Sequence, residues 1–182
     1  LPILNERAGT GNPFFSVLLS ISNHPPYVIP PYFHPHSDVL EEQIVEYADW
    51  SIRQFMQAAE KQPWFDNTIF VFLGDHGKMV GTPECEMPQS YNHIPLMIYG
   101  KDIKPGVYDG FGGQVDVSPT LLGLLNISYL QNNFGVNLLE EERPCMFFTA
   151  DNLIGARDSV NMFIYSPDSQ QEFKYKLEEG KL

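Results

Sequence analysis

One short stretch of this sequence combines residue types that can bind a metal ion. Residues 68–77 read TIFVFLGDHG, so Asp75 and His76 directly follow an apolar run and are flanked by glycines. Such a run is typical of a strand that is buried on both faces of a sheet. In open α/β sheets, ligands bind beyond the carboxyl ends of the strands. A carboxylate and an imidazole at that position suit zinc or manganese, although two adjacent ligands do not complete a coordination sphere.

Other side chains that can bind a metal ion or an anion stand at the ends of other predicted elements. They are His24, His93, Gln114 and Asp116. If the strands are parallel neighbours, these side chains converge with Asp75 and His76 at one edge of the sheet. Each also has a simpler interpretation. Asp75 can cap a turn, His76 can be a surface residue, His24 can pack on Tyr27, and the ring of His93 can hydrogen-bond the strand backbone.

Three apolar runs and one long helix are predicted to position these residues. Residues 13–22, 68–73 and 94–99 are apolar enough to form buried strands, and a turn signal follows each of them. Between the first two, apolar residues at helical spacing predict an amphipathic helix that starts at Ser37 or Asp38 and ends before Pro63. A strand–helix–strand order implies parallel neighbours and a right-handed connection.

The C-terminal part of the sequence has a different character. Residues 116–125 predict a second helix, with Ser118 as its cap and Pro119 at its first position. Three short aromatic runs follow, separated by turn residues: 145–149, 161–165 and 173–177. The prediction is therefore a single α/β domain over residues 1–182, with a mostly parallel sheet flanked by helices. Its core covers residues 13–125, and a small antiparallel β appendage covers residues 143–182.

Composition excludes some classes of protein. The sequence has 182 residues, 43% of them hydrophobic, and a formal net charge of -12. Such an acidic chain is not expected to bind nucleic acid, which selects clustered basic residues. The two cysteines, Cys85 and Cys145, match no zinc-finger spacing and are either free thiols or one disulfide. No apolar run is long enough to span a membrane.

Five motifs in order resemble one known family. They read FFSVLLSISNHPPY, YAD, FDNTIFVFLGDHG, NHIPLMIYG and GQVDVSPTLL, and the resemblance extends over residues 13–165. This order is similar to the second half of the sulfatase-type catalytic domain of the alkaline phosphatase superfamily, and is most similar to its lipoteichoic acid synthase-like branch, the phosphoglycerol and phosphoethanolamine transferases.

The resemblance implies a role for each candidate residue. Asp75 and His76 match the ligands of the catalytic divalent cation, which is Mn²⁺ or Zn²⁺, with Ca²⁺ and Mg²⁺ as alternatives. His24 matches the pocket histidine that contacts the transferred anionic group. His93 is expected to bind substrate as well, although some branches of the family have no ligand at this position.

The resemblance also implies the reaction and its missing parts. The chain is expected to be the C-terminal part of a metal-dependent hydrolase or transferase that acts on sulfate or phosphate esters through a covalent intermediate. The nucleophile is Thr or Ser in the phosphotransferases and phosphatases and a modified Cys or Ser in true sulfatases. It is expected, with a further metal ligand, in an N-terminal half that this chain lacks, because residues 1–12 are too short to hold them and neither cysteine stands in a Cys-x-Pro-x-Arg motif. The chain alone is therefore expected to be inactive. Strands that the missing half would cover are expected to favour self-association.

The same resemblance implies a location and leaves alternatives. The family branch predicts an extracytoplasmic protein on a bacterial membrane, with a membrane anchor upstream of this domain. One alternative is a relative of the cytosolic phosphoglycerate mutases and phosphopentomutases, which also have a DHG strand end. Another is a non-catalytic binding module that keeps the sulfatase-like fold.

Overall fold

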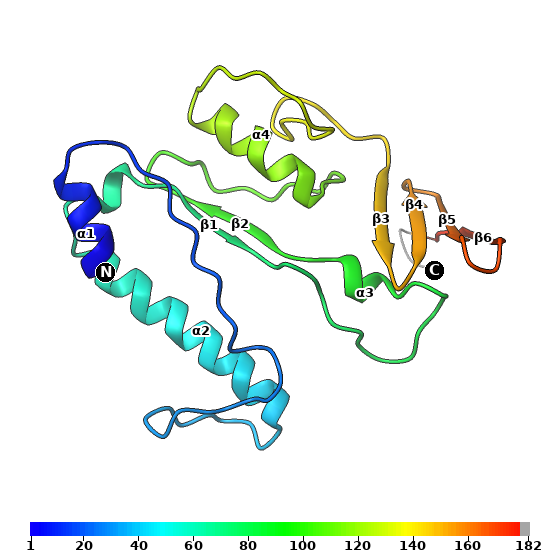
Figure 1. Cartoon of the computed structure of the whole chain (residues 1–182), viewed down its shortest axis with the longest axis horizontal. Coiled ribbons are helices and arrows are strands. Elements are labelled where there is room, and N and C mark those ends of the chain that lie inside the picture. Colours follow the sequence, from blue (N-terminus) through cyan, green and yellow to red (C-terminus); the bar gives the residue numbers. More distant parts are fainter. Residues whose placement is uncertain (179–182) are drawn as a thin grey trace. The chain divides into compact units, whose positions relative to one another are not determined.

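The computed structural model describes residues 1–178 (Figure 1). These residues cluster into two compact units: residues 1–70 with 98–103, and residues 71–97 with the described residues from 104 onward. The chain crosses between the units within β1 (Phe70–Leu73) and β2 (Leu96–Tyr99), which form a two-stranded sheet. The chain combines helices with sheets, and its C-terminal strands are antiparallel, so the predicted α/β class is confirmed.

The first unit is built around the predicted amphipathic helix. After α1 (Pro2–Gly9), the long helix α2 runs over Leu40–Ala59, and η1 (Phe65–Asn67) follows it. Helix α2 thus begins two residues after Asp38, the later of its two expected starts. Val39 is the N-cap, and the hydroxyl of Ser37 instead accepts a hydrogen bond from the Val39 amide (3.0 Å). Phe55 on the apolar face of α2 meets Phe70 edge-on at 6.2 Å between ring centroids. The helix prediction is confirmed.

The strand predicted at residues 13–22 is wrong for this structure. These residues have no regular secondary structure, and the side chains of Phe15 and Leu18 are 86% and 75% exposed. A strand is stable only when its backbone groups pair with a neighbour, and no strand pairs with this segment in the described part of the chain. The apolar pattern alone therefore did not produce a strand here.

The second unit contains two helices that follow β1. The short helix α3 covers Gln89–Asn92, and α4 covers Gln114–Leu124. The helix expected to have Ser118 as its cap and Pro119 as its first residue thus starts five residues earlier, and Pro119 lies inside it. Asp116 explains the earlier start, because its carboxylate accepts a hydrogen bond from the Gly113 amide (2.8 Å) and so caps the first turn from within.

The C-terminal residues form the predicted antiparallel appendage. Strands β3 (Met146–Ala150), β4 (Leu153–Arg157), β5 (Asn161–Ser166) and β6 (Gln171–Lys176) pair in sequence order, each antiparallel to the next. Strand β4 was not predicted, because Gly155 and Ala156 have low strand propensity. The core of this unit is a buried cluster of Met87, Met162, Ile164 and Leu177.

Two further expectations concern the cysteines and the membrane. Cys85 and Cys145 are both free thiols in the structure, so of the two alternatives the unpaired one is observed. Among residues 1–178, no helix has both the length and the apolar character that crossing a bilayer requires.

Candidate metal-binding site

Asp75 and His76 lie on the turn that leaves β1, and their reactive atoms face the same space. Asp75 Oδ2 and His76 Nε2 are 3.9 Å apart, and both side chains are more than half exposed. Asp75 uses its other oxygen, Oδ1, to accept a hydrogen bond from the His76 amide (3.0 Å). His76 Nδ1 lies 2.8 Å from the Gly77 carbonyl, which can only accept, so in the neutral ring Nδ1 carries the proton and Nε2 keeps its lone pair. The turn thus presents one carboxylate oxygen and one imidazole nitrogen in ligating form.

This pair fits two positions of a metal coordination sphere. Two ligands that bind tetrahedral zinc at about 2.0–2.1 Å lie roughly 3.3 Å apart, so a small side-chain rotation brings the observed pair into range. Their exposure leaves room for further ligands and for substrate. Within residues 1–178 there is no group of three or more His, Cys, Asp and Glu side chains close enough to hold a metal ion. The pair therefore fits only part of the coordination sphere that a metal ion requires.

The backbone of this turn is held from three directions within its own unit. The Gly74 amide donates to the Pro95 carbonyl (3.3 Å), and the Gly77 amide donates to the Tyr91 carbonyl (2.8 Å). From α4, Gln114 Nε2 donates to the carbonyls of Gly74 (3.2 Å) and Asp75 (2.7 Å). These contacts bring Gln114 to the strand end, as the sequence predicted.

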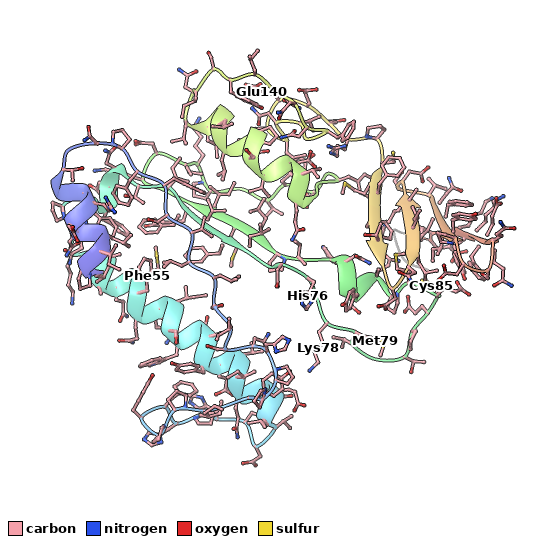
Figure 2. All side chains as sticks on the ribbon, in the orientation of Figure 1. Phe55, His76, Lys78, Met79, Cys85 and Glu140 are labelled. Atoms are coloured by element: carbon pink, nitrogen blue, oxygen red, sulfur yellow. The ribbon has the colours of Figure 1, made fainter. Side chains whose placement is uncertain are left out.

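The ring of Tyr91 supports His76 directly. The two rings stack with their centroids 5.6 Å apart and their planes 19° apart. Gly77 has no space for a side chain, because a Cβ there would lie 2.1 Å from the Ser90 carbonyl oxygen. Figure 2 shows His76 and Lys78 on the segment that follows β1. The segment 89–95 therefore orients this turn, a role that the sequence did not indicate.

The other two predicted site residues have separate surroundings. His93 ends α3 as its C-cap and is exposed, and its amide donates to the Gln89 carbonyl (2.9 Å). It therefore shares a unit with Asp75 and His76. His24 belongs to the other unit, where its exposed ring places Nδ1 2.8 Å from the Pro25 carbonyl. The roles of all four residues remain predictions.

Asp116 has a structural role that the sequence did not reveal. It is fully buried, and Arg143 donates to it from Nε (2.8 and 2.7 Å) and from Nη2 (2.6 Å). The amides of Val136 and Gly113 donate to it as well (2.8 Å each). Burial raises the pKa of Asp116, but the hydrogen bonds from Arg143 and the two amides outweigh it and lower the pKa below its usual value. Asp116 is thus an ionised anchor for α4. Its partner is 27 residues away, so no local pattern marks the pair.

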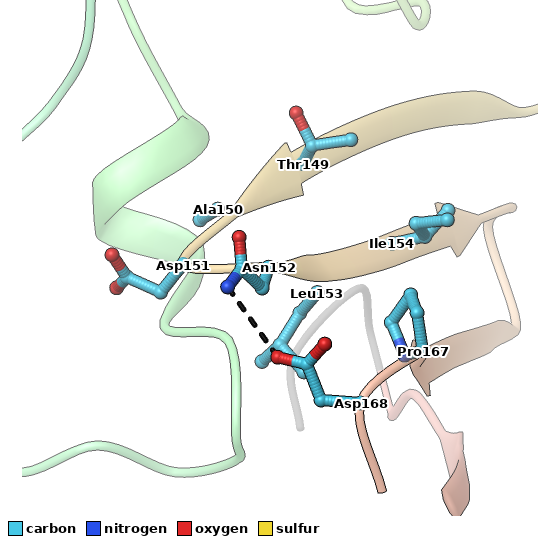
Figure 3. Close-up of a pocket in the computed structure, with 8 residues that line it drawn as sticks. All are labelled: Thr149, Ala150, Asp151, Asn152, Leu153, Ile154, Pro167 and Asp168. Atoms are coloured by element: carbon cyan, nitrogen blue, oxygen red, sulfur yellow. Dashed lines mark hydrogen bonds between the residues drawn. The ribbon is translucent and has the colours of Figure 1, made fainter. Parts of the chain in front are cut away.

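Two cavities lie at the turn between β3 and β4. One, of about 410 Å³, is lined by that turn and by Pro167 and Asp168, and in it Asn152 donates to Asp168 (3.4 Å; Figure 3). The other, of about 360 Å³, is lined by apolar side chains around Cys85 and includes Tyr91 on its wall. None of the four predicted site residues lines either cavity. The candidate site is therefore an open turn rather than one of these pockets.

Comparison with known proteins places this geometry in a family. The sulfatase family model matches residues 2–127. Lipoteichoic acid synthase 1 of Bacillus subtilis is 25% identical over 93% of this chain and 30% of its own length. Choline-sulfatase of Rhizobium meliloti is 29% identical over 59% of this chain and 22% of its own length. The chain thus spans about a third or less of these relatives.

Solved structures agree with that assignment. A crystal structure of an alkaline phosphatase superfamily protein from Vibrio parahaemolyticus superposes with a TM-score of 0.78 at 26% identity, over 96% of this chain and 47% of that one. The structure of BT1596, a 2-O GAG sulfatase, superposes with a TM-score of 0.61 at 17% identity, which shows a shared fold. The matched model covers most of the chain and includes the turn that presents Asp75 and His76, so the chain belongs to the sulfatase family, within the alkaline phosphatase superfamily.

Proposed function

We propose that this chain supplies part of the metal centre of a hydrolase or transferase that acts on sulfate or phosphate esters. The observation that carries the proposal is the Asp75–His76 turn. Its Oδ2 and Nε2 atoms are 3.9 Å apart, in ligating form and open to further ligands. The family supports the same class of reaction, because both a lipoteichoic acid synthase and a choline-sulfatase are among the relatives.

The chemistry of the site follows from its residue types. Asp75 and His76 hold a divalent cation, and Zn²⁺ or Mn²⁺ suits a mixed carboxylate and imidazole set better than Ca²⁺ or Mg²⁺. When bound, such a cation would lower the pKa of a hydroxyl and offset negative charge on the ester. This matters in a chain of net charge -12, whose own field repels an anionic ester.

Two histidines contact the ester in this proposal. His24 and His93 are both exposed and can each donate a hydrogen bond to the oxygens of a sulfate or phosphate group. The nucleophile that forms the covalent intermediate, together with at least one more metal ligand, comes from a part of the protein outside residues 1–182. That part is the partner that completes the site. We further propose that the whole protein is anchored in a bacterial membrane, with this domain on the extracytoplasmic side.

The test is made on the full-length protein with Asp75→Ala and His76→Ala. We expect each variant to lose bound metal, measured by elemental analysis after gel filtration, and to lose at least about 100-fold in ester hydrolysis or transfer. Asp109→Ala, which removes an exposed carboxylate elsewhere in the same unit, is the matched control and should keep both properties. If Asp75→Ala keeps normal metal content and activity, the proposed site is wrong.

The same assay separates the two classes of ester. An aryl sulfate and an aryl phosphate diester with one leaving group are compared at equal concentration. The ester that is hydrolysed faster identifies the reaction class. If the protein binds metal but hydrolyses neither ester, the result contradicts an ester hydrolase and favours a binding module.

A further inference from the structure

The side chain of Gln114 makes a contact whose purpose the proposed reaction does not explain. Its Nε2 donates to the Asp75 carbonyl (2.7 Å) and to the Gly74 carbonyl (3.2 Å), two consecutive acceptors at the end of β1. Gln114 itself is exposed. The core therefore does not require this side chain, and its two hydrogen bonds are directed only at the turn that presents the predicted metal ligands.

We propose that Gln114 is a positioning residue that sets the direction in which Asp75 and His76 project from the strand end. This inference rests on the proposed function. The Gly74 carbonyl belongs to the peptide plane before Asp75, and the Asp75 carbonyl belongs to the plane after it. Because peptide units are planar, an amide that holds both carbonyls fixes the two backbone dihedrals of Asp75. Those dihedrals decide where the Asp75 carboxylate and the following His76 ring point.

The turn needs such an outside support. Gly74 has no side chain to limit its backbone, so the chain can leave β1 in many directions. The hydrogen bonds from Gly74 to Pro95 and from Gly77 to Tyr91 hold the two ends of the turn. Gln114 holds the middle, where the ligands are.

The support is itself mounted on a rigid element. Gln114 is the first residue of α4, and Asp116, two positions further on, is fully buried against Arg143. The ion pair and the amides of Gly113 and Val136 fix this end of the helix. A donor built on an anchored helix end holds a backbone more accurately than one on a free loop.

The residue type matters because glutamine offers two protons on one nitrogen. Methionine has a similar length and no donor. Glutamate has the same shape but places a carboxylate against two carbonyl oxygens, which repels them. Asparagine keeps the amide on a shorter stem and can serve the turn only in part.

The experiment compares metal binding by the full-length protein carrying Gln114→Met, Gln114→Glu or Gln114→Asn. Affinities for Mn²⁺ and Zn²⁺ are measured by chelator competition, and the geometry of the site by the visible absorption of the Co²⁺-loaded protein. We expect Gln114→Met to weaken binding about tenfold and to shift the Co²⁺ bands, which is the effect typical of residues that orient metal ligands. Gln114→Glu should be weaker still, and Gln114→Asn should recover part of the loss.

The controls separate positioning from general damage. Gln54→Met removes an exposed glutamine of α2 and should leave both readouts unchanged. On an Asp75→Ala background, Gln114→Met should add little further loss, because it acts through the same ligand.

Two outcomes overturn the inference, and they are distinguishable. If Asp75→Ala abolishes metal binding while Gln114→Met keeps wild-type affinity and an unchanged Co²⁺ spectrum, Gln114 has no positioning role and the proposed function stands. If Asp75→Ala itself keeps wild-type affinity, the proposed metal site and the role of Gln114 both fall.

Discussion

Residues 70–77 are held by neighbours on several sides, whereas residues 14–21 pair with no strand in the described part of the chain. The first region pairs through β1 with β2, donates hydrogen bonds to the carbonyls of Pro95 and Tyr91, and accepts hydrogen bonds from Gln114. The second carries large apolar side chains that are mostly exposed: Phe15, Val17, Leu18, Leu19 and Ile21. Both regions are apolar runs followed by a histidine turn.

The difference shows that an apolar segment forms a strand only where a second segment pairs with it. Backbone donors and acceptors in an apolar segment must find partners, and side chains on both faces must be covered. For residues 70–73 the chain itself supplies the neighbour. Residues 14–21 have no such neighbour in the described part of the chain, and the chain spans 47% of the superposed solved relative.

The largest expected effect on stability comes from removing the Asp116–Arg143 ion pair, which fixes the start of α4 and so the support of residues 70–77. Arg143→Met leaves the fully buried Asp116 carboxylate without its cation, and should lower the free energy of unfolding by about 3–5 kcal/mol. Urea denaturation measures the loss. Arg53→Met breaks an exposed i,i+4 pair with Asp49 and should change the same quantity by less than about 0.5 kcal/mol. Similar losses of unfolding free energy in the two variants would contradict the role of the Asp116–Arg143 pair as an anchor.

A second change acts on the turn itself. Gly77→Ala places a Cβ 2.1 Å from the Ser90 carbonyl oxygen, so the backbone must shift. We expect a loss of about 1–3 kcal/mol in unfolding free energy, with weaker metal binding by chelator competition. Gly106→Ala, where a Cβ meets nothing within 4 Å, is the control. A Gly77→Ala protein of normal stability and affinity would show that the turn tolerates movement.

The anchor also predicts how stability depends on pH. The folded pKa of Asp116 lies below its usual value, so its stabilising contribution is complete above the unfolded pKa of about 3.9 and is lost as pH falls through the folded pKa. The advantage of the wild-type protein over Asp116→Asn should therefore be constant from pH 7 to 5 and shrink below about pH 4. Urea titrations at pH 7, 5 and 3 measure it. An advantage that grows in acid would reverse the sign and refute the assignment.

The smallest effect on stability is expected in the unpaired region. The double variant Val17→Lys, Leu19→Lys should change the unfolding free energy of the 182-residue chain by less than about 0.5 kcal/mol, because both side chains are already exposed. It should instead reduce self-association, measured by sedimentation velocity, since charge on an exposed apolar segment opposes its pairing with another copy. Leu130→Lys, at another exposed position, should leave association unchanged. A wild-type chain that stays monomeric at high concentration would remove the basis for this expectation.

Local pattern was enough to predict several elements and one part of the site. The helix predicted from apolar spacing and the strands predicted from aromatic runs are both observed, as α2 and in the C-terminal sheet. Helices and hairpins form from contacts near in sequence, so local patterns predict them. The DHG turn after an apolar strand also sits where its sequence predicts. Strand β4 was missed, since Gly155 and Ala156 carry little strand preference and depend on strands β3 and β5 beside them.

The long-range part of the site could not be predicted with the same means. The sequence places Asp116 among several polar residues near the strand ends. In the structure its carboxylate instead accepts hydrogen bonds from Arg143, and no sequence pattern connects the two residues. Tyr91 lies in a segment without periodicity, yet its ring stacks on His76 and its carbonyl holds Gly77. Such contacts depend on how the chain folds back, and single-sequence patterns do not encode that.

By itself, the sequence determined the residue types that can bind a cation, their place after an apolar strand, and the family to which the chain belongs. The tertiary structure decided which of those side chains lie on a backbone that is held by hydrogen bonds. It gave the Asp75 turn two backbone hydrogen bonds, to Pro95 and Tyr91, and the Gln114 donor at the start of α4, and it left residues 14–21 without a paired strand in the described part of the chain. The physical reason is that ligand type is a property of one residue, whereas orientation and strand pairing require partners distant in sequence.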